Sequence, residues 1–155
     1  MASKTPALAV LERAGVPYRL HEYLHDPQAA SYGLEAAEKL GVESGRVFKT
    51  LIVDVDGKPH VAIVPVEKEL DLRSLGKRAA MATVAEAERL SGYVTGGISP
   101  LGQRRRLSTL LDESALSFET IYVSGGRRGL EIELTPAHLA QLTGAETRRI
   151  ASERP

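Results

Sequence analysis

The chain has 155 residues, a length typical of one domain and too short for two well-buried cores. Hydrophobic residues make up 43% and charged residues 26%, which suits a folded globule and argues against disorder. Twenty Lys and Arg against twenty Asp and Glu give zero net charge, so nucleic-acid binding needs a local patch, and the absence of cysteine excludes disulfides, thiolate zinc sites and a thiol nucleophile of the protein's own.

The sequence carries no sign of a membrane or export segment. No apolar run approaches the roughly 20 residues that a membrane helix needs. Residues 1–6 lack the apolar stretch of a signal peptide. We therefore expect a cytoplasmic protein that binds no membrane, folded as a single domain over residues 1–155.

Capping and turn signals divide the first half of the chain into elements. Thr5-Pro6 and Gly15 are typical of the start and end of a helix, and Gly41 is typical of another helix end. Asp56-Gly57 suits the tight turn of a hairpin. The expected elements are a helix over 6–14, a strand over 18–24, a helix over 33–40 and strands over 46–55 and 60–66.

The second half combines helices with another hairpin. Asp71 is expected to cap a helix over 72–79, and Thr83 to Glu86 has the spacing of a capping box. In the strand over 130–134, the leucines and isoleucine alternate with Glu131 and Glu133, which predicts that both glutamates face outward. The remaining expected elements are a helix ending near Gly92, strands over 107–111 and 118–123, and a helix over 136–144.

The expected strands form hairpins and do not alternate regularly with helices. This order favours the α+β class with a mixed, mostly antiparallel sheet.

His21-Glu22-Tyr23-Leu24-His25 matches the H-E-x-x-H pattern of zinc hydrolases, which requires a helix. Pro17 and Asp26-Pro27 leave little room for one. In a strand the two histidines lie about 13 Å apart, too far to share a zinc ion bound at roughly 2 Å. We therefore expect no metal site, and no cofactor.

Lys49 shares one strand face with Val47, Leu51, Val53 and Val55, the more continuously apolar side of its segment. The pattern predicts that Lys49 points toward the interior or a pocket. Two structural alternatives are a lysine whose ammonium reaches water near the strand start and a structural ion pair.

A glycine-rich loop spans Gly96 to Gly102, where the backbone can approach a ligand and present N–H groups to negative charge. The loop matches neither the G-x-G-x-x-G pattern nor the Walker A pattern of nucleotide-binding loops. The alternative is an ordinary connecting loop. Arg104-Arg105-Arg106 and Arg127-Arg128 are the basic clusters of note. These arginines suit contact with RNA phosphates, and the alternative is that they are solvated surface residues. No aromatic residues are interleaved with them, so the sequence gives little sign of base stacking.

Four segments, taken in order and spacing, identify a family. They are Val47-Phe48-Lys49-Thr50-Leu51, Ser91-Gly92-Tyr93, Gly96 to Gln103, and Ile121-Tyr122-Val123-Ser124 continuing to Leu130. This pattern closely resembles the YbaK/EbsC family of bacterial Cys-tRNA(Pro) and Cys-tRNA(Cys) deacylases, over about residues 5–150.

The resemblance implies a free-standing editing enzyme similar to the editing domain of bacterial prolyl-tRNA synthetases. It implies a curved mixed sheet surrounded by helices, and a protein that hydrolyses mischarged tRNA in transient association with prolyl-tRNA synthetase and does not bind DNA. Such editing makes chemical sense, because cysteine and alanine are no larger than proline and a synthetase pocket does not exclude them by size.

Carried over residue by residue, the essential lysine of the family falls on Lys49. The resemblance assigns the remaining substrate-binding positions to Tyr23, Tyr32, Gly33, Thr50, Gly96, Gly97, Ile98, Ser99, Pro100, Leu101 and Gly102. Relatives often carry phenylalanine at Tyr32. They also often carry an acid early in the last helix, which we place at His138, so the role of that acid is in doubt here.

The route implied for cysteinyl substrates is attack by the substrate's own sulfur on its ester, with Lys49 positioning the ester or ribose and backbone N–H groups near Gly97 to Gly102 assisting. One alternative is hydrolysis of Ala-tRNA(Pro) or another mischarged tRNA by water. Another is a non-catalytic module that binds tRNA or synthetase through its arginines.

Overall fold

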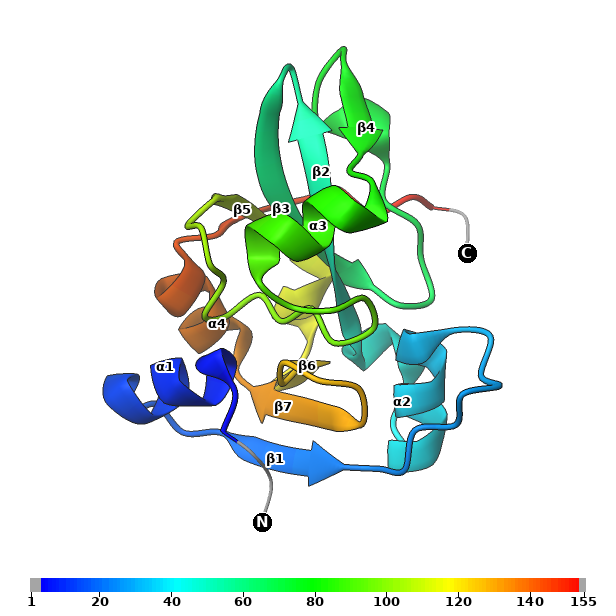
Figure 1. The fold of residues 1–155 in the computed structure, drawn as a ribbon, viewed down its shortest axis with the longest axis vertical. Helices are drawn as coiled ribbons and strands as arrows, with labels where there is room; N and C mark the ends of the chain where they lie inside the picture. Colours follow the sequence, from blue (N-terminus) through cyan, green and yellow to red (C-terminus); the bar gives the residue numbers. More distant parts are fainter. Residues whose placement is uncertain (1–3, 154–155) are drawn as a thin grey trace.

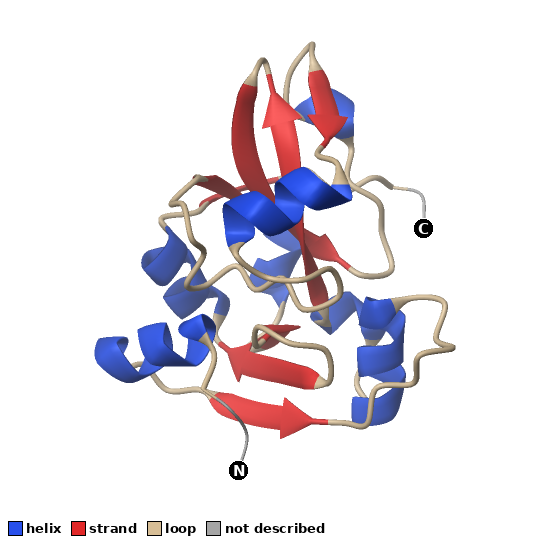
Figure 2. Ribbon diagram, viewed as in Figure 1, coloured by secondary structure: helices blue, strands red, loops and turns tan. Residues whose placement is uncertain are grey.

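The computed structural model describes residues 4–153, and within them the chain forms four α-helices and eight strands in two sheets (Figures 1 and 2). Three short 3-10 helices complete the fold. The helices are α1 (Pro6–Ala14), α2 (Tyr32–Leu40), α3 (Val84–Ser91), α4 (Pro136–Thr143), η1 (Ser44–Arg46), η2 (Leu72–Ser74) and η3 (Glu113–Ser117). The strands are β1 (Arg19–Glu22), β2 (Phe48–Val55), β3 (Lys58–Pro65), β4 (Ala79–Met81), β5 (Ser108–Asp112), β6 (Ile121–Ser124), β7 (Leu130–Leu134) and β8 (Glu146–Arg148).

Side-chain caps fix where the α-helices begin. The side chains of Thr5, Ser31, Thr83 and Thr135 each accept a hydrogen bond from the backbone N–H three residues on. A glycine in the left-handed conformation follows each helix. The helices expected over 6–14 and 33–40, the helix expected to end near Gly92 and the helix expected over 136–144 are confirmed.

The longer sheet has the order β4-β2-β3-β5-β8. Strands β2 and β3 form the expected hairpin, with Asp56 and Gly57 at φ of 51° and 86° in its turn, whereas β3, β5 and β8 are parallel. The shorter sheet, β1-β7-β6, is antiparallel. The α+β class with mixed strands is confirmed, divided between two sheets that meet at the Val47–Tyr122 bridge.

The main core lies between the two sheets and under α1, α3 and α4 (Figure 1). Its largest fully enclosed side chains include Phe48, Ile63, Leu111, Ile132 and Leu139. A smaller cluster packs α2 against Val47, Val66 and Tyr122. Helix α2 therefore covers one face of the three-stranded sheet.

Two sequence predictions about local structure are wrong. The expected helix over 72–79 is only the short η2, whose Asp71 makes no side-chain cap, and Ala79–Met81 instead pairs with the edge of β2. Glu131 does not face solvent, because it is only 7% exposed. Glu131 instead lines an interior cavity together with Tyr23 and Tyr32, and strand alternation does not reveal this tertiary arrangement.

Among residues 4–153, no helix is long and apolar enough to cross a membrane. Residues 1–3, part of the segment on which the signal-peptide prediction rests, lie outside the described residues, as do residues 154–155.

Candidate active site

A cavity of about 380 Å³ lies where the two sheets, α2, α3 and the glycine-rich loop meet. This volume is within the range of roughly 300–1,000 Å³ found for small-molecule sites. Its walls come from segments far apart in the sequence. They are Tyr23, Ala30 to Gly33, Val47 to Ile52, Val66, Met81, Ala82, Val84, Ala87, Thr95, Gly96, Ile98, Ser124 and Glu131.

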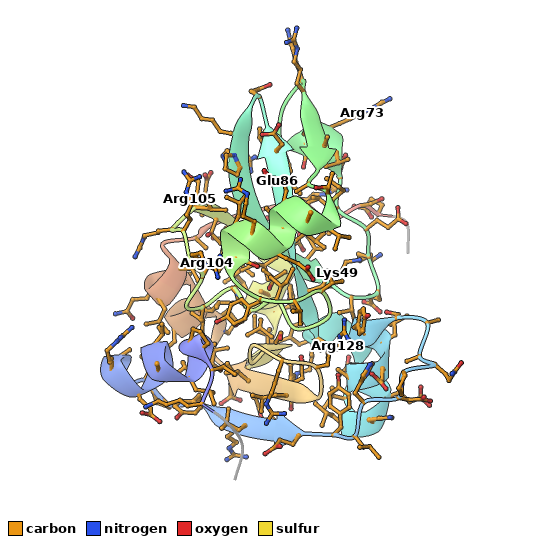
Figure 3. The ribbon with its side chains drawn as sticks, viewed as in Figure 1. Lys49, Arg73, Glu86, Arg104, Arg105 and Arg128 are labelled. Carbon is orange, nitrogen blue, oxygen red and sulfur yellow. The ribbon has the colours of Figure 1, made fainter. Side chains whose placement is uncertain are left out.

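Lys49 lines this cavity from β2, and Figure 3 shows it between α3 and Arg128. The prediction that Lys49 faces a pocket is therefore confirmed. Burial lowers the pKa of Lys49, and the charge of Glu69 opposes this shift in part. Because the ammonium makes no hydrogen bond or ion pair with another described residue, it is available to a ligand.

Two further polar residues, Thr50 and Glu131, belong to the lining of the cavity. The hydroxyl of Thr50 is buried and hydrogen-bonds to nothing in the described part of the chain. Burial raises the pKa of Glu131 to about 8, so this carboxyl group is largely protonated at neutral pH. Burial, followed by the charge of Glu131, raises the pKa of Tyr23 to about 12.

Tyr32 and Gly96 form one rim of the cavity, and Arg128 contacts Tyr32 there. The Arg128 guanidinium lies 5.0 Å from the centre of the Tyr32 ring, and its Nε donates to the carbonyl of Thr95 at 2.9 Å. A Cβ atom added at Gly96 would lie 2.7 Å from the Tyr32 ring, and one at Gly33 would lie 2.2 Å from Val66. Both glycines are needed for close packing at this rim.

The glycine-rich loop reaches the cavity only at its first half. Gly96 and Ile98 line the cavity, whereas Gly97, Ser99, Pro100, Leu101 and Gly102 do not. Ser99 and Leu101 are buried, and the Tyr93 hydroxyl donates to the Leu101 carbonyl at 2.6 Å. These residues anchor the loop to the core, so their predicted contact with substrate has no support in the geometry.

The expected help from backbone N–H groups is also corrected in part. The Gly97 N–H donates to the Val94 carbonyl at 2.9 Å, and the Leu101 N–H donates to the Ser99 hydroxyl at 3.2 Å. Neither donor is free to stabilise an oxyanion.

The two arginine clusters lie on different parts of the surface. Figure 3 places Arg104 and Arg105 beside the C-terminal end of α3, away from Lys49 and Arg128. Arg105 and Arg106 line a separate hollow of about 350 Å³ with Arg13. At the cavity side, Arg127 pairs with Glu22 at 3.3 Å. The predicted RNA contacts therefore divide into a group near the cavity and a group remote from it.

The two histidines of the H-E-x-x-H segment contact different carboxylates. His21 pairs with Glu133 at 2.8 Å and His25 pairs with Glu35 at 2.7 Å, at different places. Within residues 4–153 no group of three or more such side chains is arranged to hold a metal ion.

His138, considered as the site of the family acid, does not line the cavity. The acid that does is Glu131, which sequence reasoning missed. The alternation of Glu131 with leucines and an isoleucine predicts a strand with one buried face and one exposed face. The sequence does not show that the face carrying Glu131 is also buried.

The family model of the aminoacyl-tRNA editing domain matches residues 26–142. This chain belongs to that family. The resemblance found in the sequence motifs is thereby confirmed, and the cavity at the centre of the matched region becomes the candidate active site of an editing domain.

Three similar proteins extend this finding. EbsC of Enterococcus faecalis, described as a candidate Cys-tRNA(Pro)/Cys-tRNA(Cys) deacylase, is 37% identical over 97% of this chain and 94% of its own. The multifunctional Ser/Thr-tRNA deacylase ProXp-y of Escherichia coli is 28% identical over 90% and 87%. A solved structure, described as a candidate trans-editing enzyme for prolyl-tRNA synthetase, covers 95% of both chains at 27% identity with a TM-score of 0.84.

Proposed function

We propose that this editing domain is an aminoacyl-tRNA deacylase, and that its substrate is Cys-tRNA(Pro). The observation that carries the proposal is the unpaired, half-buried ammonium of Lys49 in a cavity that the buried Glu131 carboxyl also lines. The relatives named for deacylation support it. We treat residues 1–155 as one domain acting on the acceptor end of tRNA.

The chain has no cysteine, so the thiol in this proposal belongs to the substrate. The cysteinyl sulfur attacks its own ester carbonyl, the bond from that carbon to the ribose oxygen breaks, and the thiol proton ends on that oxygen. The products are a cyclic thiolactone and tRNA with a free end. The protein supplies orientation, which accounts for large rate gains in intramolecular reactions.

Lys49 is the catalytic residue in this scheme. Its charge holds the ester and ribose in place and stabilises negative charge on the carbonyl oxygen. Half-burial strengthens this effect, because water screens the ammonium less than at the surface. Tyr23, Tyr32, Gly33, Thr50, Gly96 and Ile98 shape the cavity around the acyl group.

A second candidate is hydrolysis of an alanyl, seryl or threonyl ester by water. The Glu131 carboxyl favours it, since this group lines the cavity and is placed to hold a water molecule beside the ester. The name of the Escherichia coli relative points to seryl and threonyl substrates for that protein.

The decisive experiment measures single-turnover cleavage of Cys-, Ala-, Ser-, Thr- and Pro-tRNA(Pro) with enzyme in excess. Rapid loss of the cysteinyl ester with Pro-tRNA(Pro) intact supports thiol assistance. Preference for another mischarged ester supports water as nucleophile. Binding of tRNA without cleavage of any ester would instead support a non-catalytic binding module.

Lys49→Ala should lower the rate at least 100-fold while the melting temperature stays near that of the wild type. The matched control is Lys77→Ala, because Lys77 is exposed and does not line the cavity. Full activity of Lys49→Ala would remove this lysine from the mechanism.

The partner we propose is prolyl-tRNA synthetase, engaged transiently in the cytoplasm, which delivers the mischarged tRNA. The similarity to a solved protein described as a candidate trans-editing enzyme for that synthetase supports this association. Faster clearance of Cys-tRNA(Pro) when the synthetase is added would test it.

A further inference from the structure

The proposed mechanism assigns no binding site to the base of the terminal nucleotide of the tRNA. The scissile ester joins the amino acid to the terminal ribose, and the ribose also carries a nucleobase. When the ester lies beside Lys49, the base must lie within one sugar of the cavity. Every tRNA ends in adenosine, so this base is a purine with two broad apolar faces.

The edge of the cavity near α3 offers an apolar surface of the right kind. Met81, at the end of β4, and Val84, at the start of α3, both line the cavity, yet they are 48% and 61% exposed. Ala82 and Ala87 continue this wall inward. None of these four side chains carries a polar group, so the wall suits a flat apolar ligand.

Tyr32 is the other large apolar residue of the lining that is exposed, and its ring already has contacts. Arg128 lies 5.0 Å from its ring centre, the His25 ring lies 5.6 Å away, and Gly96 packs closely against it. A base that stacked on Tyr32 would have to displace Arg128 from both the ring and the Thr95 carbonyl. Met81 and Val84 require no such displacement.

We propose that Met81 and Val84 form a subsite for the adenine of the 3′-terminal nucleotide. This inference rests on the proposed deacylase function and adds the position of the base. The base lies on the α3 side of the mouth, the ribose and ester lie beside Lys49, and the acyl group points inward. Contact with apolar side chains recognises a base face that all tRNAs share, so the subsite contributes affinity without choosing among tRNAs.

The test compares Met81→Ser/Val84→Ser with wild type on two substrates. One is the mischarged tRNA established as substrate, and the other is the same tRNA with an abasic terminal nucleotide. Leu116→Ser is the matched control, since Leu116 is 62% exposed and lies outside the cavity lining. Thermal unfolding shows whether the double variant is folded, and single Met81→Ser and Val84→Ser variants replace it if it is not.

We expect the double variant to raise KM about tenfold on the natural substrate with little change in kcat, because ground-state and transition-state contacts are lost equally. On the abasic tRNA, wild type and variant should have the same KM. Equal KM values for both enzymes on the natural tRNA, or an undiminished variant effect on abasic tRNA, would overturn the subsite. Failure of wild type to cleave any ester would instead refute the deacylase function.

Discussion

At the scale of single residues, burial shifts the two ionisable groups of the cavity in opposite directions. It lowers the pKa of Lys49 and raises the pKa of Glu131 to about 8. Both shifts favour the neutral form, because removing a charge from water is costly. The cavity therefore tolerates these groups at a cost in stability, which is typical of residues kept for function.

Glu131 makes stability depend on pH in a direction that can be measured. The unfolded chain releases this proton near pH 4.5, whereas the folded chain keeps it to about pH 8. Between these values the folded state binds more protons, so the free energy of unfolding falls as pH rises, by at most about 1.4 kcal/mol per pH unit. Glu131→Gln replaces the carboxyl group by an amide of similar shape that does not titrate. The variant should have a flatter slope and should be more stable than wild type at pH 8.

Urea unfolding of both proteins at intervals from pH 5 to 8 measures this slope. Glu146→Gln is the control, since Glu146 is exposed on β8 and should leave the slope as it is. A Glu131→Gln variant with the wild-type slope would show that the carboxyl group is ionised throughout this range.

At the scale of elements, local signals succeed where a few neighbouring residues decide the backbone. Thr5-Pro6 and Gly15 define α1, and Asp56-Gly57 defines the β2–β3 turn, because caps and tight turns depend on adjacent side chains and backbone angles. The segment over 79–81 fails for the opposite reason. Its backbone hydrogen bonds are made with β2, more than twenty residues away, and no local pattern shows that partner.

In the candidate site, too, local patterns predict some features, whereas contacts between distant segments decide others. Alternation along β2 predicts that Lys49 turns inward, and the structure agrees. The meeting of Tyr32 with Gly96 is a tertiary contact, so only the family resemblance assigned both to one site. The burial of Glu131 depends on segments distant in the sequence that enclose the cavity, such as those of Tyr23 and Tyr32, which neither strand alternation nor the resemblance indicated.

The glycine-rich loop should be intolerant of a side chain at the point where it meets α2. Gly96 has φ of 89°, and a Cβ there would lie 2.7 Å from the Tyr32 ring and 2.9 Å from Arg128 Nε. Gly96→Ala should therefore displace this rim and lower the single-turnover rate at least tenfold, in addition to a backbone cost of about 1–2 kcal/mol.

Gly15→Ala separates the two effects, because Gly15 has φ of 67° but open space around it. Both variants should lose stability, measured by thermal unfolding, and only Gly96→Ala should lose activity. Equal activity in the two variants would mean that the Tyr32 rim does not shape the bound substrate.

At the scale of the whole molecule, charge is balanced and its basic residues are dispersed. The net charge is zero, and Figure 3 shows Arg104 and Arg105 well separated from Lys49 and Arg128. Part of the basic charge near the cavity is already paired, since Arg127 contacts Glu22. No long-range attraction therefore guides tRNA toward one continuous basic face.

Binding of free tRNA should accordingly be weak and sensitive to salt. The two arginine clusters provide few side chains for phosphate contact. Each phosphate contact contributes roughly one unit to the slope of log K against log salt. We expect micromolar or weaker dissociation constants near physiological salt and a slope of about −2 to −4, measured by fluorescence anisotropy.

Arg127→Ala/Arg128→Ala should reduce both the slope and the deacylation rate, because Arg128 contacts Tyr32 and Thr95, which line the cavity. Arg104→Ala/Arg105→Ala should reduce the slope while sparing cleavage of a short acceptor-stem substrate, since that pair lies beside the C-terminal end of α3 and does not line the cavity. A nanomolar complex that salt does not weaken would contradict this account and would require a large uncharged contact with RNA.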